Sequence, residues 1–175
     1  MKLHIGPGKA YLPGWVNVDI LSTTHCDVYS NALALPYPRG SFFLIYASHV
    51  LEHFNRHLIL AALTHWRDLL IPGGILRLAV PDFDAIVKQY LQNRKVEELI
   101  GLLYGGQDSH FNEHHIVFDE ASLTRILQTV GFTNVREWDW HEVEHGMYDD
   151  YSQAYLPSFD KEKGRLMSLN LEAEK

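Results

Sequence analysis

Two glycines and an aspartate near the N-terminus have the types and spacing of a nucleotide-binding turn. Gly6-Pro7-Gly8 follows the short apolar segment 2–5, and Asp19 lies at the end of the β-rich segment 15–20. Glycines at a strand end let the backbone turn sharply and approach a ligand, and a carboxylate there can accept hydrogen bonds from ribose hydroxyls. Each feature alone also fits an ordinary turn.

A second group of residues has the spacing of a metal site. His49-Val50-Leu51-Glu52-His53 matches the H-x-x-E-H pattern of a class of zinc peptidases, with both histidines on one helical face. Zinc-dependent hydrolysis at His49, Glu52 and His53 is therefore an alternative function. It would require a third ligand, which the sequence does not place, and we expect no bound metal.

Further histidines stand in the segment 110–115, which contains His110, Glu113, His114 and His115. This cluster could bind metal, supply a base or form a polar loop. Imidazole changes its charge near neutral pH. The candidates for acid–base catalysis are His49, His53 and His114.

Strands must position these groups. The continuous apolar run 42–47 is typical of a strand buried on both faces of a parallel sheet. We predict seven strands, the sixth parallel to the others and the last antiparallel, at 2–5, 15–20, 27–30, 42–47, 75–80, 134–140 and 166–171.

Between strands the apolar period changes to three and four residues, which predicts helices. One runs from Leu51 to a stop at Pro72-Gly73-Gly74, and others begin at Asp82 or Asp84 and at Asp119 and end near Asn93 and at Gly131, with a short helical piece before Gly105-Gly106. The alternation predicts an α/β fold with helices on both faces of the sheet. Residues 9–14 are too few for a crossover helix, so coverage is reduced near the first strands.

The ordered motifs resemble class I S-adenosylmethionine-dependent methyltransferases, which have a Rossmann-like sheet. The chain is similar to small, uncharacterised members that begin almost directly at the first strand. The similarity covers most of the chain and is carried, in order, by Leu3-His4-Ile5-Gly6-Pro7-Gly8, Asp19, Asn31-Ala32-Leu33-Ala34-Leu35-Pro36, the segment 41–54, Leu70-Ile71-Pro72-Gly73-Gly74, Phe118-Asp119-Glu120 and Gly131-Phe132.

The resemblance implies S-adenosylmethionine as the cofactor and assigns a part of it to each motif. The turn Gly6-Pro7-Gly8 would border the methionine moiety, and Asp19 would hold the ribose. Adenine would lie beside Asn31 and Ala32, and the sulfonium near Ser48 and His49. Two positions depart from the pattern: His4 replaces a frequent acidic residue and Ala10 a further glycine.

The acceptor of the methyl group is not specified by a motif. After the predicted fourth strand the chain reads Ala47-Ser48-His49-Val50, without the Asn/Asp-Pro-Pro-aromatic motif of many amino-group methyltransferases. This favours an oxygen or carbon acceptor, on a small or glycan-like molecule. The connection 141–164, rich in histidine and tyrosine, is predicted to emerge at the cofactor edge and cover the acceptor. A cofactor-binding domain without catalysis is a further alternative.

Length and composition indicate one globular domain, 1–175. The net charge of −7 without a Lys/Arg cluster argues against a nucleic-acid partner. No apolar run reaches the roughly 20 residues that span a bilayer. A nicotinamide-dependent oxidoreductase is disfavoured because its ribose carboxylate stands about 20 residues after the glycines, and Asp19 is closer to Gly8. We expect a cytoplasmic protein without a membrane partner.

Overall fold

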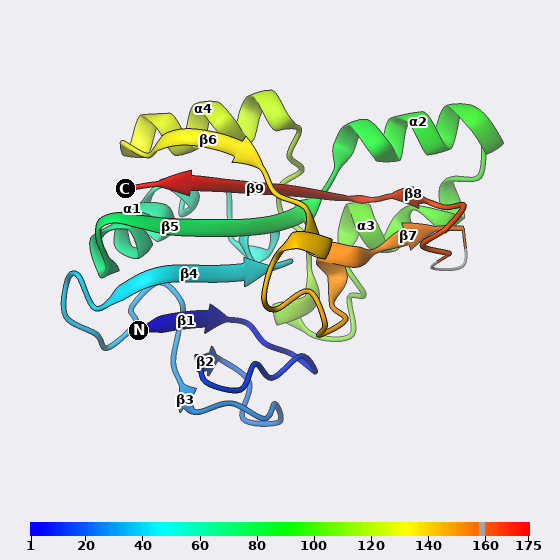
Figure 1. The fold of residues 1–175 in the computed structure, drawn as a ribbon. Coiled ribbons are helices and arrows are strands. Elements are labelled where there is room, and N and C mark those ends of the chain that lie inside the picture. The colour runs from blue at the N-terminus through cyan, green and yellow to red at the C-terminus, as the bar shows by residue number, and fades with distance from the viewer. Residues whose placement is uncertain (158–159) are drawn as a thin grey trace.

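A seven-stranded sheet organises the chain. The computed structural model describes residues 1–157 and 160–175. The strand order is β3-β2-β1-β4-β5-β9-β6 (Figure 1). The bounds are β1 Lys2–Ile5, β2 Val16–Asp19, β3 Val28–Tyr29, β4 Phe42–Ser48, β5 Leu70–Pro81, β6 Thr133–Glu137 and β9 Ser168–Glu174. Strands β1 to β5 pair in parallel, and β9 runs antiparallel between β5 and β6. The predicted mostly parallel sheet with an antiparallel last strand is confirmed.

Four α-helices accompany the sheet in the described part of the chain: α1 Ile59–Leu69, α2 Phe83–Asn93, α3 Ile100–Tyr104 and α4 Glu120–Val130. Shorter 3₁₀ helices are η1 Leu51–His53, η2 Val96–Glu98, η3 His110–Asn112, η4 Trp140–Glu142 and η5 Tyr151–Gln153. A small antiparallel sheet pairs β7, Tyr155–Leu156, with β8, Arg165–Leu166. Every helix among the described residues is too short or too polar to cross a membrane.

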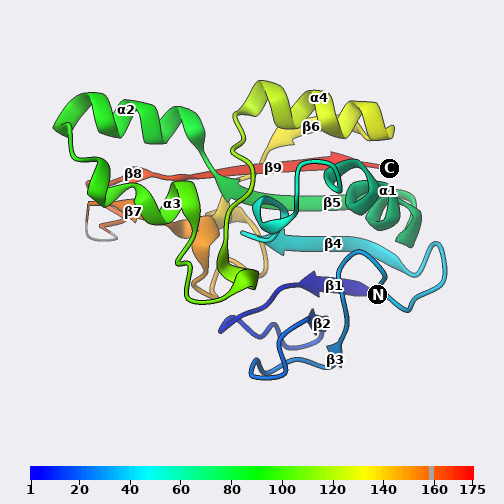
Figure 2. The ribbon, with the colours of Figure 1, turned by 180° about the vertical axis from the view of Figure 1, so that it is seen from behind.

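The two faces of the sheet are covered differently. Helices α1 and α4 lie on one face (Figure 2), where Trp66 and Leu127 belong to the main apolar core. On the other face, Leu12, Trp15 and Trp138 pack around Tyr46, and no described α-helix joins this second core. The expectation of helices on both faces is therefore wrong for the second face. The connections from β1 to β2 and from β2 to β3, residues 6–15 and 20–27, are too short for a crossover helix, and the irregular chain after β6 covers this face instead.

The helix predicted from Leu51 to Pro72 is interrupted. Only η1 and α1 form, because the Asn55 side chain accepts a hydrogen bond from the His57 N–H at 3.0 Å and its carbonyl accepts one from Leu58 at 2.7 Å. Such a local turn competes with helical hydrogen bonds. The helix also ends at Leu69, and Pro72-Gly73-Gly74 lies within an irregularity at the start of β5, where pairing with β4 shifts register.

The predicted helix ends are confirmed elsewhere. Asp82 caps α2, and Asp119 caps α4 by accepting a hydrogen bond from Ser122 N–H at 2.7 Å. Gly105 follows α3, and Gly131, with a φ of 97°, ends α4.

Several strand ends differ from the prediction. Strand β5 begins earlier than expected, at Leu70, and β9 ends later, at Glu174. Strand β6 stops at Glu137, because Asp139 caps η4 directly afterwards. Leu166 pairs with Tyr155 in the small sheet, so the last strand begins at Ser168.

Candidate active site

A cleft of about 1140 Å³ opens beyond the carboxyl ends of the parallel strands. Its walls are the turns after β1 and β2, the end of β4, and two segments from later in the chain, 108–112 and 149–154. Open α/β sheets bind ligands at this edge. The cleft thus brings together the glycine turn, the residues after β4 and part of the connection 141–164, as expected from the sequence. Residues 158–159 of that connection lie outside the described residues.

The first wall requires glycine. Gly6 has a φ of 66°, and a Cβ there would lie 2.5 Å from Cγ2 of Val50. Gly8 has a φ of 51°, also in the region that favours glycine, and nothing lies within 4 Å of the position of its Cβ. Both line the cleft with Pro7. The turn therefore packs against the chain after β4 at Gly6 and leaves space for a ligand at Gly8.

Asp19 connects the turns after β1 and β2, which form part of the cleft wall. Its carboxylate is 7% exposed and accepts hydrogen bonds from the N–H of Leu21 at 2.9 Å and of Gly8 at 3.4 Å. Gly8 and Leu21 line the cleft, whereas Asp19 is not among the lining residues. In this structure Asp19 positions the two turns by these hydrogen bonds.

Asn31 and Ala32 lie outside the cleft, in the turn after β3. The Asn31 side chain accepts a hydrogen bond from the Leu33 N–H at 2.9 Å, and the Ala32 carbonyl accepts one from Trp66 Nε1 at 2.8 Å. Part of the cleft wall is formed instead by residues that the motifs did not single out. Tyr11 and His25 stack there with ring centroids 4.3 Å apart. Such a pair offers the planar, apolar surface on which an adenine base can stack.

Ser48 and His49 form the floor of the cleft at the end of β4. Ser48 Oγ is buried and has no hydrogen-bond partner among the described residues. His49 has a φ of 52°, in the left-handed region. Its Nε2 lies 3.3 Å from Ser168 Oγ, and its ring lies against Tyr151 at 5.3 Å. A strained backbone at a cleft is a frequent property of functional residues.

Behind His49 lies a fully buried carboxylate. Glu52 is 0% exposed, and Nδ1 of His49 lies 3.2 Å from its Oε1. Neither carboxylate oxygen, however, accepts a hydrogen bond of good geometry from the described residues. Burial raises the pKa of Glu52, but the neighbouring His49 and then His53 outweigh it and the net direction is downward.

The side chains of the histidine cluster 110–115 differ in burial and in their distance from Glu52. Nε2 of His114 lies 3.9 Å from Oε1 of Glu52, and its ring is 4.8 Å from that of His53. Burial lowers the pKa of His114. His110 has a 97% exposed side chain, and His115 is exposed as well. Of the cluster, only His114 reaches the site.

A smaller cavity of about 320 Å³ adjoins the cleft. Both cavities are lined by His49, His53, Asn112, Tyr151 and Ala154. The second cavity continues between apolar side chains, among them Leu102, Leu156 and Met167. The candidate catalytic residues His49 and His53 thus lie where the two cavities meet.

Buried polar contacts attach the connection 141–164 to the sheet. The Tyr46 hydroxyl on β4 donates a hydrogen bond to Asp150 at 2.6 Å, and the His145 ring stacks on the Tyr46 ring at 4.0 Å. Burial and then the charge of Arg77 lower the pKa of His145 to about 3. No sequence motif indicates this network, because Tyr46 and Arg77 are far from His145 and Asp150 in the chain.

Comparisons with known proteins find methyltransferases that have this fold. A family model described as a methyltransferase domain matches residues 10–137, well over half of the chain. A search among curated proteins found no match. A solved S-adenosylmethionine-dependent methyltransferase from Archaeoglobus fulgidus superimposes with a TM-score of 0.60 at 14% identity, over 99% of this chain and 85% of that one.

Two further structures have the same fold. One, from Thermotoga maritima, is described as a possible histamine N-methyltransferase and has a TM-score of 0.66 at 14% identity, over 99% of this chain and 81% of that one. The other is the 1,6-didemethyltoxoflavin-N1-methyltransferase of Burkholderia thailandensis, solved with S-adenosylhomocysteine. Its TM-score is 0.60 at 16% identity, over 99% of this chain and 70% of that one.

The chain belongs to the methyltransferase-domain family, and its fold is that of S-adenosylmethionine-dependent methyltransferases. The class suggested by the sequence motifs is confirmed. The protein is an enzyme of methyl transfer.

Proposed function

We propose that the enzyme methylates an oxygen or carbon atom of a small or glycan-like acceptor, bound where the smaller cavity meets the cleft. The observation that carries this proposal is the junction of the two cavities at His49 and His53. One cavity has room for a nucleoside cofactor, and the other opens onto the same residues.

The residues of the larger cleft fit S-adenosylmethionine. The backbone of Gly6 and Gly8 would hold its methionine moiety, and Tyr11 with His25 would contact the adenine. When bound, the cofactor supplies a methyl group activated by a sulfonium. Methyl transfer then depends mainly on alignment and on exclusion of water. The segments 108–112 and 149–154 face the glycine turn across the cleft and would provide that exclusion.

The smaller cavity fits the acceptor. Its volume of about 320 Å³ is at the lower end of the range for small-molecule sites. Apolar walls with polar groups at the mouth suit a ring that carries a reactive hydroxyl or carbon. The absence of the Asn/Asp-Pro-Pro-aromatic motif after β4 supports an acceptor other than an amino group.

His49 is the residue that we propose as the base for an acceptor that must lose a proton. An acceptor hydroxyl that takes the place of Ser168 Oγ at Nε2 would give its proton to His49, while Glu52 beside Nδ1 orients the ring and stabilises the imidazolium. A cytoplasmic location, and the lack of nucleic-acid and membrane partners, stay predictions from the sequence.

Filling the smaller cavity tests the acceptor site. Gly101 on α3 lines this cavity but not the cleft, and nothing lies within 4 Å of the position of its Cβ. We expect Gly101→Phe to lower methyl transfer at least about 10-fold, the effect of losing about 1.4 kcal/mol of acceptor binding. Affinity for S-adenosylhomocysteine should stay unchanged.

The assay uses methyl-labelled S-adenosylmethionine with a panel of phenols, sugars and activated carbon acids, and Gly101→Ala is the matched control. If Gly101→Phe methylates the accepted compound at the rate of Gly101→Ala, the acceptor does not bind in this cavity.

A further inference from the structure

The buried carboxylate of Glu52 has no well-formed hydrogen bond within the described part of the chain, although imidazole rings surround it. It is 0% exposed, and both oxygens are without a well-formed hydrogen bond among residues 1–157 and 160–175. A buried charge is strongly unfavourable unless it is paired or coordinates a metal. The nearest groups are imidazole rings, with His49 Nδ1 at 3.2 Å and His114 Nε2 at 3.9 Å.

The rings of His53 and His114 are oriented like those of histidines that bind a metal. Nδ1 of His53 lies 3.1 Å from the Glu113 carbonyl, and Nδ1 of His114 lies 2.9 Å from the Leu102 carbonyl. A carbonyl only accepts hydrogen bonds, so each Nδ1 carries the proton and each Nε2 of a neutral ring keeps its lone pair. Metal-binding histidines typically donate their second nitrogen to a backbone carbonyl or carboxylate in this way.

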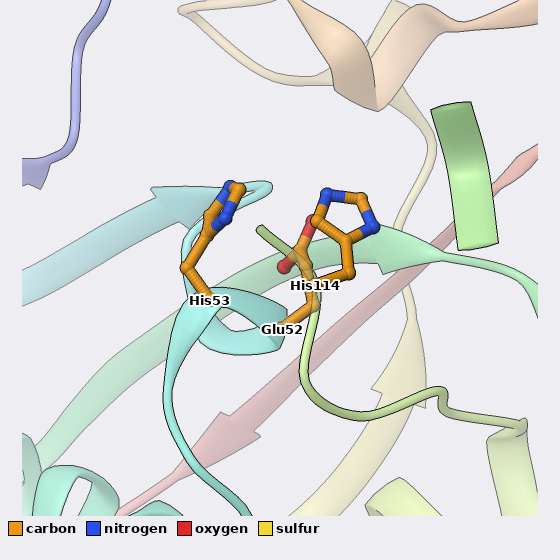
Figure 3. A group of neighbouring side chains, drawn as sticks. All are labelled: Glu52, His53 and His114. Carbon is orange, nitrogen blue, oxygen red and sulfur yellow. The ribbon is translucent and has the colours of Figure 1, made fainter. Parts of the chain in front are cut away.

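We propose that Glu52, His53 and His114 bind one divalent transition-metal ion, with Zn²⁺ as the representative. Figure 3 shows the three side chains together, and their ligand atoms all lie within 4.8 Å of one another. An ion about 2.1 Å from each ligand draws them to roughly 3–4 Å apart. His53 and His114 belong to a short 3₁₀ helix and an irregular segment, which can adjust more readily than the sheet.

The donor set selects the type of ion. Two imidazoles and one carboxylate suit Zn²⁺, Fe²⁺ or Co²⁺, whereas Mg²⁺ and Ca²⁺ prefer oxygen ligands only. The pattern in the sequence pointed to His49 and His53 and left the third ligand unplaced. In the proposed site His114, 61 residues after His53, supplies that ligand, and His49 lies beside Glu52 with its Nε2 directed to Ser168.

The site opens toward the acceptor. His53 lines both cavities and His114 lines the smaller one, so further coordination positions of the ion face the region proposed for the acceptor. There the ion would hold an acceptor oxygen and lower the pKa of its hydroxyl. This role rests on the proposed function, whereas binding of the ion does not.

Metal uptake by the whole chain tests the site. Protein purified without an affinity tag is stripped with a chelator, dialysed against Zn²⁺, Co²⁺ or Mg²⁺, and analysed for metal content. We expect one Zn²⁺ or Co²⁺ per chain and much weaker binding of Mg²⁺. Glu52→Gln, His53→Gln and His114→Gln should each weaken Zn²⁺ binding more than about 100-fold, beyond the 10–100-fold effect of losing an outer-shell partner. His110→Gln, at a 97% exposed side chain, is the control.

Absence of stoichiometric uptake, or wild-type affinity in Glu52→Gln, would overturn the site and leave Glu52 neutralised by protonated histidines. Should a variant fail to fold, X-ray absorption of the wild type with Zn²⁺ decides: two imidazoles in the coordination shell support the site, and any other number contradicts it. Titration of the same samples with S-adenosylhomocysteine separates the two proposals. Cofactor binding without metal overturns only the metal site, and metal without cofactor binding overturns the proposed function.

Discussion

His49 is the residue at which conformation and chemistry coincide. Its φ of 52° is unusual for a residue with a side chain, and His49 lines both cavities. Glu52 and Ser168 approach its two ring nitrogens and fix the ring. We therefore assign acid–base chemistry to His49 and, as proposed above, metal binding to Glu52, His53 and His114.

Replacing the imidazole without changing the backbone tests this assignment. Asn tolerates the left-handed conformation, so His49→Asn should fold like the wild type. We expect methyl transfer to an oxygen acceptor to fall about 10²–10⁴-fold, the usual contribution of a general base. Binding of S-adenosylhomocysteine, measured by calorimetry, should change little. His57→Asn, at an exposed position, is the control, and equal rates in the two variants would remove His49 from the chemistry.

Among the elements, the connection between β6 and β9 covers the second face of the sheet, whereas α1 and α4 cover the first. It packs Trp138 on the sheet, places Asp150 on Tyr46 and brings Tyr151 to the cleft. His145 is buried within it and has a pKa of about 3 in the folded protein. Attachment of this segment should therefore depend on pH.

The sign of that dependence follows from proton binding. The unfolded chain binds a proton at His145 below its ordinary value of 6.5, whereas the folded protein does so only near 3. The contribution of His145 to the free energy of unfolding is thus complete above pH 6.5. It decreases as the pH falls toward 3, by about 1.4 kcal/mol per pH unit. In His145→Phe, which can keep the stacking on Tyr46, the loss between pH 6.5 and 4.5 should be smaller. Urea unfolding at several pH values measures it, with His57→Phe as control, and an unchanged slope in His145→Phe contradicts the argument.

Local sequence signals predicted the secondary-structure elements better than their tertiary packing. Asp82, Asp119 and Gly131 marked helix ends correctly because capping depends on a few neighbouring residues. The apolar period from Leu51 to Leu69 did not reveal the turn at Asn55, because Leu51 still packs in the core beside α1. Covering of the second face and the approach of His114 to Glu52 depend on long-range packing, which periodicity does not report.

The candidate site was predicted to a similar extent. The glycine turn and the residues after β4 line the cleft as expected, because strand ends of a parallel sheet share one edge. Asp19, Asn31 and Ala32 do not line it, and Tyr11 and His25 do. A stacked aromatic pair formed by two separate turns has no sequence motif.

At the scale of the whole molecule, one sheet edge serves cofactor, acceptor and, as we propose, metal. In the proposed arrangement, the first two turns form the cofactor wall, and segments from the second half of the chain form much of the acceptor wall. The central claim is that the larger cleft binds the cofactor of methyl transfer.

Calorimetric titration with S-adenosylhomocysteine tests this claim most directly, on the wild type and on Gly6→Val. Any side chain at position 6 meets Val50 and forces an unfavourable backbone conformation. We expect one site per chain in the wild type and at least about 10-fold weaker binding in Gly6→Val, a loss of about 1.4 kcal/mol of binding free energy. Gly101→Ala, at a position outside the larger cleft, should bind like the wild type. A wild-type protein that binds neither S-adenosylhomocysteine nor S-adenosylmethionine, or a Gly6→Val protein of undiminished affinity, would contradict it.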